Sequence, residues 1–254
     1  MKVLIKILLL ALTLLGLSGA VLANNFQQDD LLFVEDTDQE FITLGMLEFP
    51  PYAYSEAGSQ ECIGYVVETT KKIFAQYGFN VKSICAPAIR VYRMIQSGKV
   101  DLTVNVQSTK MLQDHVVFFP TPYSKLDLLL ISHKDRGFEN LVSGIRGFDY
   151  HGQREKLVAE GFIFQDTPGS IDAVRMFVRE RTRHLITYKI PYKFYLEQNS
   201  FDVSPDTDIK FLLDLPTFYA ISNKSKHKQF IIRSLEDLAT KTQVNKFEDI
   251  SPLY

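Results

Sequence analysis

Several features are scarce in this sequence of 254 residues. It has no Trp, only two Cys and a formal net charge of −2 at pH 7, so it lacks the basic surplus that a nucleic-acid-coating protein needs. Its 46% hydrophobic and 23% charged residues exclude a disordered or collagen-like chain. Phosphate-cradling glycine loops, dinucleotide fingerprints and G-x-S-x-G elbows are absent, so we predict no cofactor and no catalytic residue. The five His are scattered without ligand spacing, which predicts surface positions and no metal site.

The first segment has the three-part pattern of a secretory signal peptide. Residues 1–23 begin with Lys2 and Lys6, continue as an apolar run and end in small residues at Ala23. An uncleaved anchor is the alternative, but the apolar run is short for a membrane span of about 20 residues. We therefore predict cleavage after Ala23 and export from the cytoplasm. Residues 24–40 come next as an acidic lead-in without basic residues.

The two Cys suit an oxidising compartment. Cys62 precedes an amphipathic helical stretch and Cys85 ends an extended one, so a strand running back beside the helix would bring them together. We predict a Cys62–Cys85 disulfide, which would stabilise the fold by about 3 kcal/mol in the chain-entropy model. Two buried free thiols are the alternative.

Strand and helix periods alternate from residue 41 onwards. Extended segments are predicted at 41–47, 79–84, 100–106 (alternating, hence half-buried), 126–132, 144–147, 162–165, 184–188, 209–213 and 218–222. Helices are predicted at 64–77, 88–97 (with Gly98 as its cap), 151–160, 170–181, 190–197 and 227–242.

Two such series predict an α/β protein with two lobes, each a mixed or parallel-rich sheet flanked by helices. We assign 41–125 plus 219–254 to lobe 1 and 126–218 to lobe 2, with hinge crossings near 124–132 and 214–220. The cleft between the lobes is the expected binding site.

Six short motifs, in order, resemble the bacterial extracellular solute-binding proteins of family 3, the amino-acid-binding type. They are Phe49-Pro50-Pro51-Tyr52-Ala53-Tyr54, Gly64, Arg90, Ser97-Gly98-Lys99-Val100-Asp101, Phe119-Pro120-Thr121-Pro122-Tyr123 and Gly147-Phe148-Asp149-Tyr150. The resemblance covers about 40–254. It implies a type II periplasmic-binding-protein-like fold, a monomer whose lobes close on a small molecule, and a membrane permease or sensor as partner.

The chain departs from this family at two anchors. Where amino-acid binders carry a Thr-x-x-Arg whose arginine clamps the ligand carboxylate, Thr109-Lys110-Met111-Leu112 places Leu112. Where lobe 2 often offers an aspartate to the ligand ammonium, the chain has Thr187-Tyr188-Lys189. The ligand is therefore not a plain α-amino acid, or other groups substitute.

The candidate ligand-binding residues fall into three kinds. Arg90 and Arg146, from opposite lobes, could grip an anion, with surface charge as the alternative. Asn105, Ser108 and Thr109 could form neutral hydrogen bonds with the ligand, with helix N-capping by Ser108 or Thr109 as the alternative. The third kind are tyrosines whose rings could line the cleft, with packing in the core as the alternative: Tyr52, Tyr54, Tyr123, Tyr150 and Tyr188.

We therefore predict a periplasmic binding protein that captures a small polar or anionic solute for an ABC-type uptake system. A sensory module without transport is one alternative. A dehydratase-like enzyme, which the same scaffold resembles, is another; it needs a titratable group in the cleft, for which Glu68 is the one candidate.

Overall fold

The computed structural model describes residues 40–56, 59, 61–134, 139–202 and 205–250. The predicted signal peptide lies outside them, as does the acidic lead-in apart from Glu40. The strands are β1 (Phe41–Met46), β2 (Tyr54–Ser55), β3 (Cys62–Ile63), β4 (Asn80–Cys85), β5 (Leu102–Asn105), β6 (Val116–His133), β7 (Leu141–Ile145), β8 (Ile163–Thr167), β9 (His184–Tyr188) and β10 (Thr207–Ser222). The helices are α1 (Tyr65–Ala75), α2 (Ala88–Ser97), α3 (Gln153–Ala159), α4 (Ser170–Val178), α5 (Lys189–Gln198) and α6 (Lys228–Thr242), with 3-10 turns η1 (Lys110–Leu112) and η2 (Phe247–Ile250).

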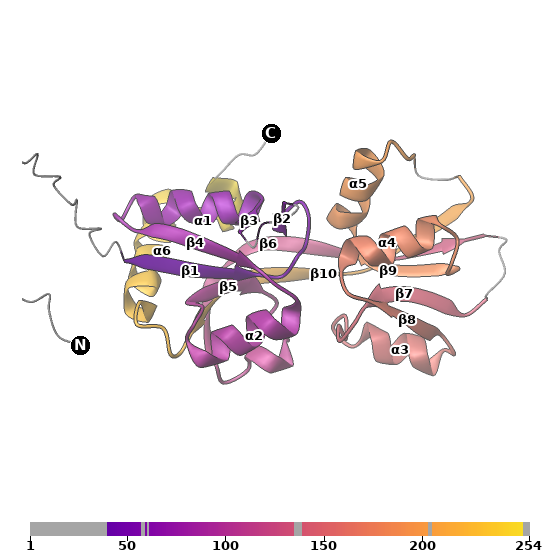
Figure 1. Cartoon of the computed structure of the whole chain (residues 1–254), viewed down its shortest axis with the longest axis horizontal. Coiled ribbons are helices and arrows are strands. Elements are labelled where there is room, and N and C mark those ends of the chain that lie inside the picture. Colours follow the sequence, from indigo (N-terminus) through magenta and orange to yellow (C-terminus); the bar gives the residue numbers. More distant parts are fainter. Residues whose placement is uncertain (1–39, 57–58, 60, 135–138, 203–204, 251–254) are drawn as a thin grey trace, which may run out of the picture. The chain divides into compact units, whose positions relative to one another are not determined.

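Two lobes share two long strands (Figure 1). The strand order is β4-β1-β5-β10-β6-β9-β7-β8, and β2 pairs with β3 separately. In lobe 1, β1 runs parallel to β4 and β5, while β10 is antiparallel to β5. In lobe 2, β7 runs parallel to β8 and β9, and β9 is antiparallel to β6. The two-lobed α/β fold with two crossings is confirmed, and its mixed strands form one continuous eight-stranded sheet.

Each crossing between the lobes is made by a continuous strand, so the predicted ends of these strands were wrong. The extended segments 209–213 and 218–222 are one strand, β10, and 126–132 is the second half of β6. Prolines concealed this continuity in the sequence. Pro120 and Pro122 lie in the first half of β6, which pairs with β10 on one edge and with no strand of the described residues on the other. Proline has no amide hydrogen to donate, and an unpaired strand edge does not need that hydrogen bond.

The pairing also locates the passage between lobes. Pro122 pairs with Phe218, which pairs in turn with Asn105 of lobe 1, whereas Leu128 pairs with Tyr188 of lobe 2. The crossing in β6 therefore falls between residues 122 and 128. The numbered lobe boundaries stay a prediction.

In each lobe, helices cover both faces of the sheet (Figure 1). In lobe 1, α1 and α6 pack on one face through residues such as Phe74 and Leu235, and α2 packs on the other through Ile95. In lobe 2, α4 and α5 cover one face and α3 the other. Strand β5 is therefore buried along its whole length, which corrects the prediction of a half-buried strand.

Helix α2 agrees closely with its sequence signals. It begins after Pro87 and ends at Gly98, which has φ 78° and ψ 10°, the left-handed conformation of a C-cap. Val91, Tyr92 and Ile95 form its buried face at helical spacing.

Three of the five His are buried, contrary to the prediction of surface positions: His133, His184 and His227. The first two are tolerated inside because a ring nitrogen bonds a backbone carbonyl, 3.2 Å from Phe177 O and 2.8 Å from Glu139 O. Over the described part of the chain, no three His, Cys, Asp or Glu side chains form a potential metal site.

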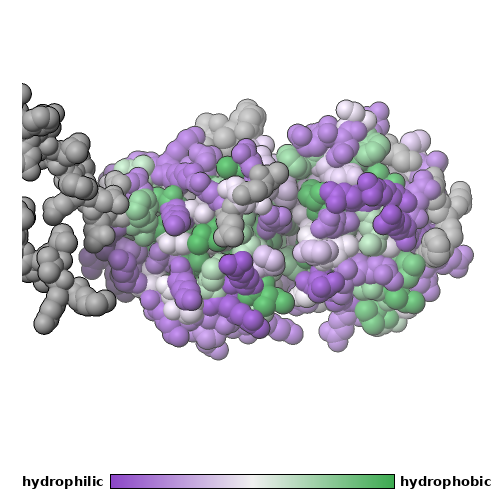
Figure 2. Space-filling view, in the orientation of Figure 1, coloured by the Kyte–Doolittle hydropathy of each residue, from purple (hydrophilic) through white to green (hydrophobic). Residues whose placement is uncertain are grey.

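The surface of lobe 2 carries an apolar patch. Figure 2 shows it over α3 and β8, where Val158 and Ile163 are 54% and 58% exposed. None of the helices formed by the described residues has the length and apolar character to cross a membrane.

Candidate functional site

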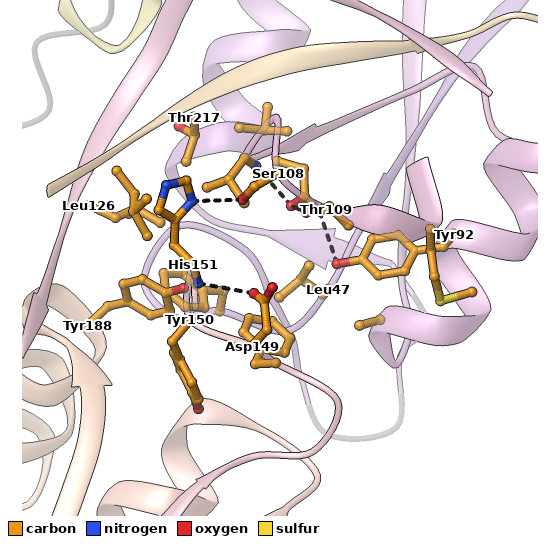
Figure 3. A pocket seen from close by; sticks show the side chains of 18 of the residues that line it. Leu47, Tyr92, Ser108, Thr109, Leu126, Asp149, Tyr150, His151, Tyr188 and Thr217 are labelled. Atoms are coloured by element: carbon orange, nitrogen blue, oxygen red, sulfur yellow. Dashed lines mark hydrogen bonds between the residues drawn. The ribbon is translucent and has the colours of Figure 1, made fainter. Parts of the chain in front are cut away.

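A cleft of about 400 Å³ lies between the lobes. Lobe 1 contributes the carboxyl ends of β1 and β5, the turn at Phe49 and the 3-10 turn η1; lobe 2 contributes the loop after β7 and the end of β9. Leu126, Leu215 and Thr217 of the crossing strands also line it, and Figure 3 labels Leu126 and Thr217. Parallel strands that end at one edge place their succeeding loops together, which is why both lobes face this cleft.

Most of the predicted residues lie in this cleft. The lining includes Tyr52, Asn105, Ser108, Thr109, Tyr123, Arg146, Tyr150 and Tyr188.

Two predicted residues, Tyr54 and Arg90, do not line the cleft. The ring of Tyr54 lies 5.9 Å from that of Phe194 on α5, so it contacts lobe 2 elsewhere. The first turn of α2 presents Ala88 and Ile89 to the cleft, and Arg90 comes after them on the exposed side of the helix.

A tight turn sets the position of Tyr52. The Phe49 and Ala53 backbones exchange hydrogen bonds of 2.6 and 3.1 Å, and the Pro50–Pro51 peptide is cis. The Tyr52 carbonyl then accepts a 2.9 Å bond from the Val66 amide, which ties the turn to the start of α1.

The residue that permits this junction is Gly64. Its φ is 118°, and a Cβ there would lie 2.6 Å from the Pro51 carbonyl oxygen and 2.7 Å from that of Tyr52. Only glycine fits, so the Gly64 motif is a backbone requirement of the site.

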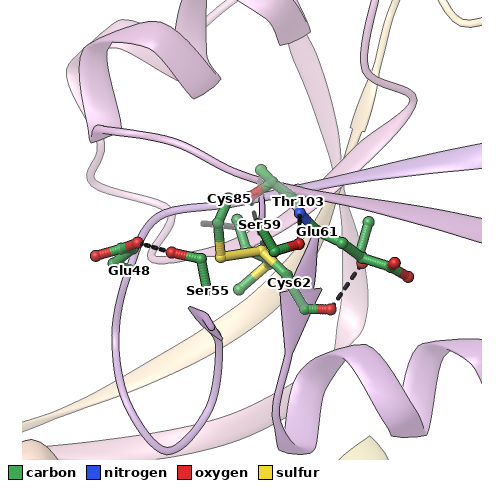
Figure 4. The surroundings of a disulfide bond; sticks show 9 residues. Glu48, Ser55, Ser59, Glu61, Cys62, Cys85 and Thr103 are labelled. Atoms are coloured by element: carbon green, nitrogen blue, oxygen red, sulfur yellow. Dashed lines mark hydrogen bonds between the residues drawn. A yellow bond between two sulfur atoms is a disulfide. The ribbon is translucent and has the colours of Figure 1, made fainter. Parts of the chain in front are cut away.

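The disulfide anchors the same region (Figure 4). Cys62 and Cys85 are bonded across 23 residues, as predicted, which joins β3 to the end of β4. Because Ser55 of β2 pairs with Cys62 and its hydroxyl donates to the Glu48 carboxylate, the chain on both sides of the Tyr52 turn is held in place.

Five rings form a continuous series, here called the aromatic wall: Phe148, Tyr150, Tyr188, Phe49 and Tyr52. Their successive ring centroids are 5.8, 6.2, 5.2 and 6.1 Å apart. The step from Tyr188 to Phe49 passes from lobe 2 to lobe 1. The planes of successive rings are inclined by 51°, 44°, 67° and 27°, so the wall gives the cleft one apolar side of tilted rings that spans both lobes.

The hydroxyls of this wall are neutral. Burial, with the negative charge of Glu248, raises the pKa of Tyr52 to about 12. Burial raises the pKa values of Tyr150 and Tyr188 well above the ordinary range. None of the three can provide a negative charge to a ligand near neutral pH.

The loop after β7 carries Arg146 into the cleft and is held in shape by Arg154. The Arg154 guanidinium donates to the carbonyls of Phe148 (2.6 Å) and Ile145 (2.9 Å) and to the Asp166 carboxylate (2.7 Å). The Tyr150 hydroxyl accepts a 2.5 Å bond from the Ile145 amide inside the same loop. Arg154 is a positioning residue that no sequence motif indicated, because its partners are mostly backbone carbonyls.

The polar candidates of lobe 1 are largely bonded to one another. Asn105 Oδ1 accepts from Thr109 Oγ1 at 2.7 Å and from the Val106 amide at 2.9 Å, while its Nδ2 donates to the Tyr92 hydroxyl at 3.1 Å. Asn105 thus orients the segment after β5. Thr109 is the N-cap residue of η1 but makes no side-chain cap bond.

A hydrogen bond joins the lobes across the cleft. His151 Nδ1 lies 3.1 Å from the Ser108 hydroxyl oxygen (Figure 3). Tyr150 and His151 both have positive φ, 52° and 58°, and this backbone turn directs the imidazole towards lobe 1.

The charged side chains of the cleft come from both lobes. Lys110 of η1 and Arg146 of the β7 loop line it, and Asp149 is the carboxylate that lines it among the described residues. Leu112, at the position where a clamping arginine was expected, is fully buried against Tyr92 and Ile95. The sequence did not indicate Lys110, because helical spacing does not tell which side chain of a three-residue turn faces a cleft.

Comparisons with known proteins agree with this geometry. Residues 42–249 match the sequence profile described as bacterial extracellular solute-binding proteins, family 3. A comparison with curated protein sequences finds no match.

The solved structures are similar in fold. A histidine kinase sensor domain with similarity to periplasmic binding proteins is 18% identical, with a TM-score of 0.66 over 84% of this chain and 94% of that one. The substrate-binding protein of an amino-acid ABC transporter is 15% identical, with a TM-score of 0.64 over 83% and 98%. A mutant of the arginine-binding protein ArgBP from T. maritima is 18% identical, with a TM-score of 0.62 over 83% and 92%.

Proposed function

Because this chain belongs to the bacterial extracellular solute-binding proteins of family 3, we propose that it captures a small polar or anionic solute in the periplasm by closing its lobes. It works as a monomer and leaves the solute chemically unchanged. The captured solute passes to an ABC-type membrane permease.

The observation that supports this proposal is the cleft with one cation from each lobe, Lys110 and Arg146. Closure brings both cations onto one anionic group. Charge-assisted hydrogen bonds are about twice as strong as neutral ones, so such a solute would stabilise the closed form.

The test is a thermal-shift screen of the protein purified from the periplasm against amino acids, organic acids, amines and short peptides. A ligand at 100-fold excess over its Kd adds about 2.7 kcal/mol to the unfolding free energy. For a domain of this size we expect the Tm to rise by about 5–11 °C. A panel that leaves the Tm unchanged in every class contradicts solute capture.

A sensory module without transport is the second candidate, and the likeness to a sensor domain favours it. The two roles share the capture step and differ in the fate of the captured solute. Deletion of the gene should abolish uptake of the labelled solute if the protein serves a permease. Uptake that persists while a transcriptional response to the solute is lost would assign it to sensing.

The enzyme alternative lacks its expected group. Glu68 lies exposed on α1, 3.6 Å from the Lys71 ammonium, and does not line the cleft. We therefore expect a bound solute to be recovered unchanged by mass spectrometry after prolonged incubation. Loss of water from the solute would favour a dehydratase.

A further inference from the structure

We propose that the solute is a monoanionic organic acid with an aromatic apolar body and no ammonium group, such as an aryl-alkanoate, rather than an α-amino acid. The inference rests on the proposed solute-binding function and names the ligand class of the same cleft. Three features of the lining carry it: its charge, the engagement of its one described carboxylate within its own loop, and the aromatic wall.

The charge of the lining matches a single negative charge. Lys110 and Arg146 are positive and Asp149 is negative, so the Lys, Arg, Asp and Glu side chains of the described lining leave a net of one positive charge. An arginine fork and a lysine ammonium are both suited to a carboxylate. A zwitterion carries no net charge and would leave this excess unmatched.

The described cleft lining offers an ammonium group a single carboxylate, Asp149. A second carboxylate, Asp127, does not line the cleft, and it lies 3.3 Å from the ammonium of Lys189, the residue after Tyr188. Asp149 already accepts a 3.0 Å hydrogen bond from the His151 amide, in a loop that also presents Arg146. The neutral phenols of Tyr150 and Tyr188 supply no negative charge, so an ammonium bound here would have to share Asp149 with the His151 amide and with Arg146 of the same loop.

The aromatic wall specifies the body of the ligand. Phe49, Tyr150 and Tyr188 are at most 7% exposed, and Phe148 and Tyr52 at the two ends are half-buried. Pre-packed rings lose little entropy when a planar group stacks on them, and offset or edge-to-face ring pairs add about 0.5–1.5 kcal/mol beyond their burial. A cavity of about 400 Å³ is within the range of small-molecule sites.

The experiment compares ligands that share one ring and differ in charge. Calorimetry on the purified protein measures 3-phenylpropanoate, L-phenylalanine and phenethylamine, together with benzoate and phenylacetate to vary the chain length. We expect at least one acid to bind at least about tenfold tighter than L-phenylalanine, and phenethylamine to give no heat.

Variants assign the binding to the cleft. Arg146→Ala and Lys110→Ala should each weaken the acid at least about tenfold, since a hydrogen bond to a charged group is lost. Arg179→Ala, at the exposed end of α4 and outside the cleft lining, is the matched control and should leave the Kd unchanged. Circular dichroism confirms that each variant is folded.

The outcomes distinguish failure of the proposed ligand class from failure of the proposed solute capture. Tighter binding of L-phenylalanine, or of any amino acid in the thermal-shift panel, overturns the ligand class and leaves solute capture intact. If none of the acids binds while another class of compound does, the ligand class is likewise wrong and solute capture stands. If no class binds, both the ligand class and solute capture are wrong.

Discussion

The loop that carries Arg146 should depend on Arg154 for its conformation, and Arg154→Ala tests this. Arg154 is 23% exposed and donates to the Ile145 and Phe148 carbonyls and to Asp166, with its guanidinium 4.0 Å above the Phe164 ring. One planar group thus ties the two ends of the turn to β8, and its removal leaves both carbonyls without this donor.

The magnitude comes from these contacts. Hydrogen bonds to charged groups contribute about 1.5–3 kcal/mol each, and water can replace some of them at a partly exposed site. We expect Arg154→Ala to lower the unfolding free energy by about 3 kcal/mol and the Tm by about 6–12 °C. Arg154→Lys keeps the charge but loses the planar fork, so its loss should be about half as large.

The assay is urea unfolding monitored by circular dichroism, because a chain without Trp offers no indole signal. Arg175→Ala is the control: its guanidinium pairs with Asp172 at 2.9 Å on the surface of α4, a pair worth less than about 0.5 kcal/mol. If Arg154→Ala is as stable as Arg175→Ala, the proposed hold on the loop is wrong. Ligand affinity should fall with Arg154→Ala even where the protein remains folded, since Arg146 moves with the loop.

Three further predictions concern stability. Replacing Cys62 and Cys85 by Ser should cost about 3 kcal/mol in urea unfolding, the entropy of a 23-residue loop, and an unchanged midpoint would contradict the bond. Gly64→Ala should cost at least about 2 kcal/mol and weaken ligand binding, because the new Cβ would lie 2.6 Å from the Pro51 carbonyl; wild-type values in both assays would refute the requirement. Burial lowers the pKa of His184 below 6.5, so the unfolded chain binds a proton that the folded one does not. Stability is therefore complete above about pH 6.5 and falls as the pH drops through that value towards the folded-state pKa. A His184→Gln variant should show a flatter dependence between pH 7 and 5, and an equal slope would exclude His184 as the cause.

Local patterns predicted the elements that have local causes. Helix α2 ends where Gly98 allows a left-handed residue, and β9 (His184–Tyr188) has the predicted bounds. The length of β6 and β10 could not be predicted in this way. Whether a proline ends a strand depends on which of its sides is paired, and that is a property of the assembled sheet.

The candidate site shows the same division. Tyr52 and Arg146 were found because turn motifs place them at strand ends, where an α/β fold opens its clefts. Arg90 was expected there as well, but the helix turns it to the exposed side. Lys110 and Arg154 carried no motif. Helical spacing does not tell which side chain of the short turn η1 faces the cleft, and the partners of Arg154 are mostly backbone carbonyls, which no residue type marks.

The sequence by itself determined the α/β class, the two lobes and the turn chemistry around Tyr52, because these depend on periodicity or on neighbours along the chain. It favoured the Cys62–Cys85 disulfide over two free thiols, and the structure contains that bond. Only the tertiary structure decided which charges and rings face the cleft. That choice depends on contacts between residues far apart in sequence, such as Phe49 against Tyr188 and His151 against Ser108. Side-chain direction at such contacts is set by packing, which no local pattern encodes.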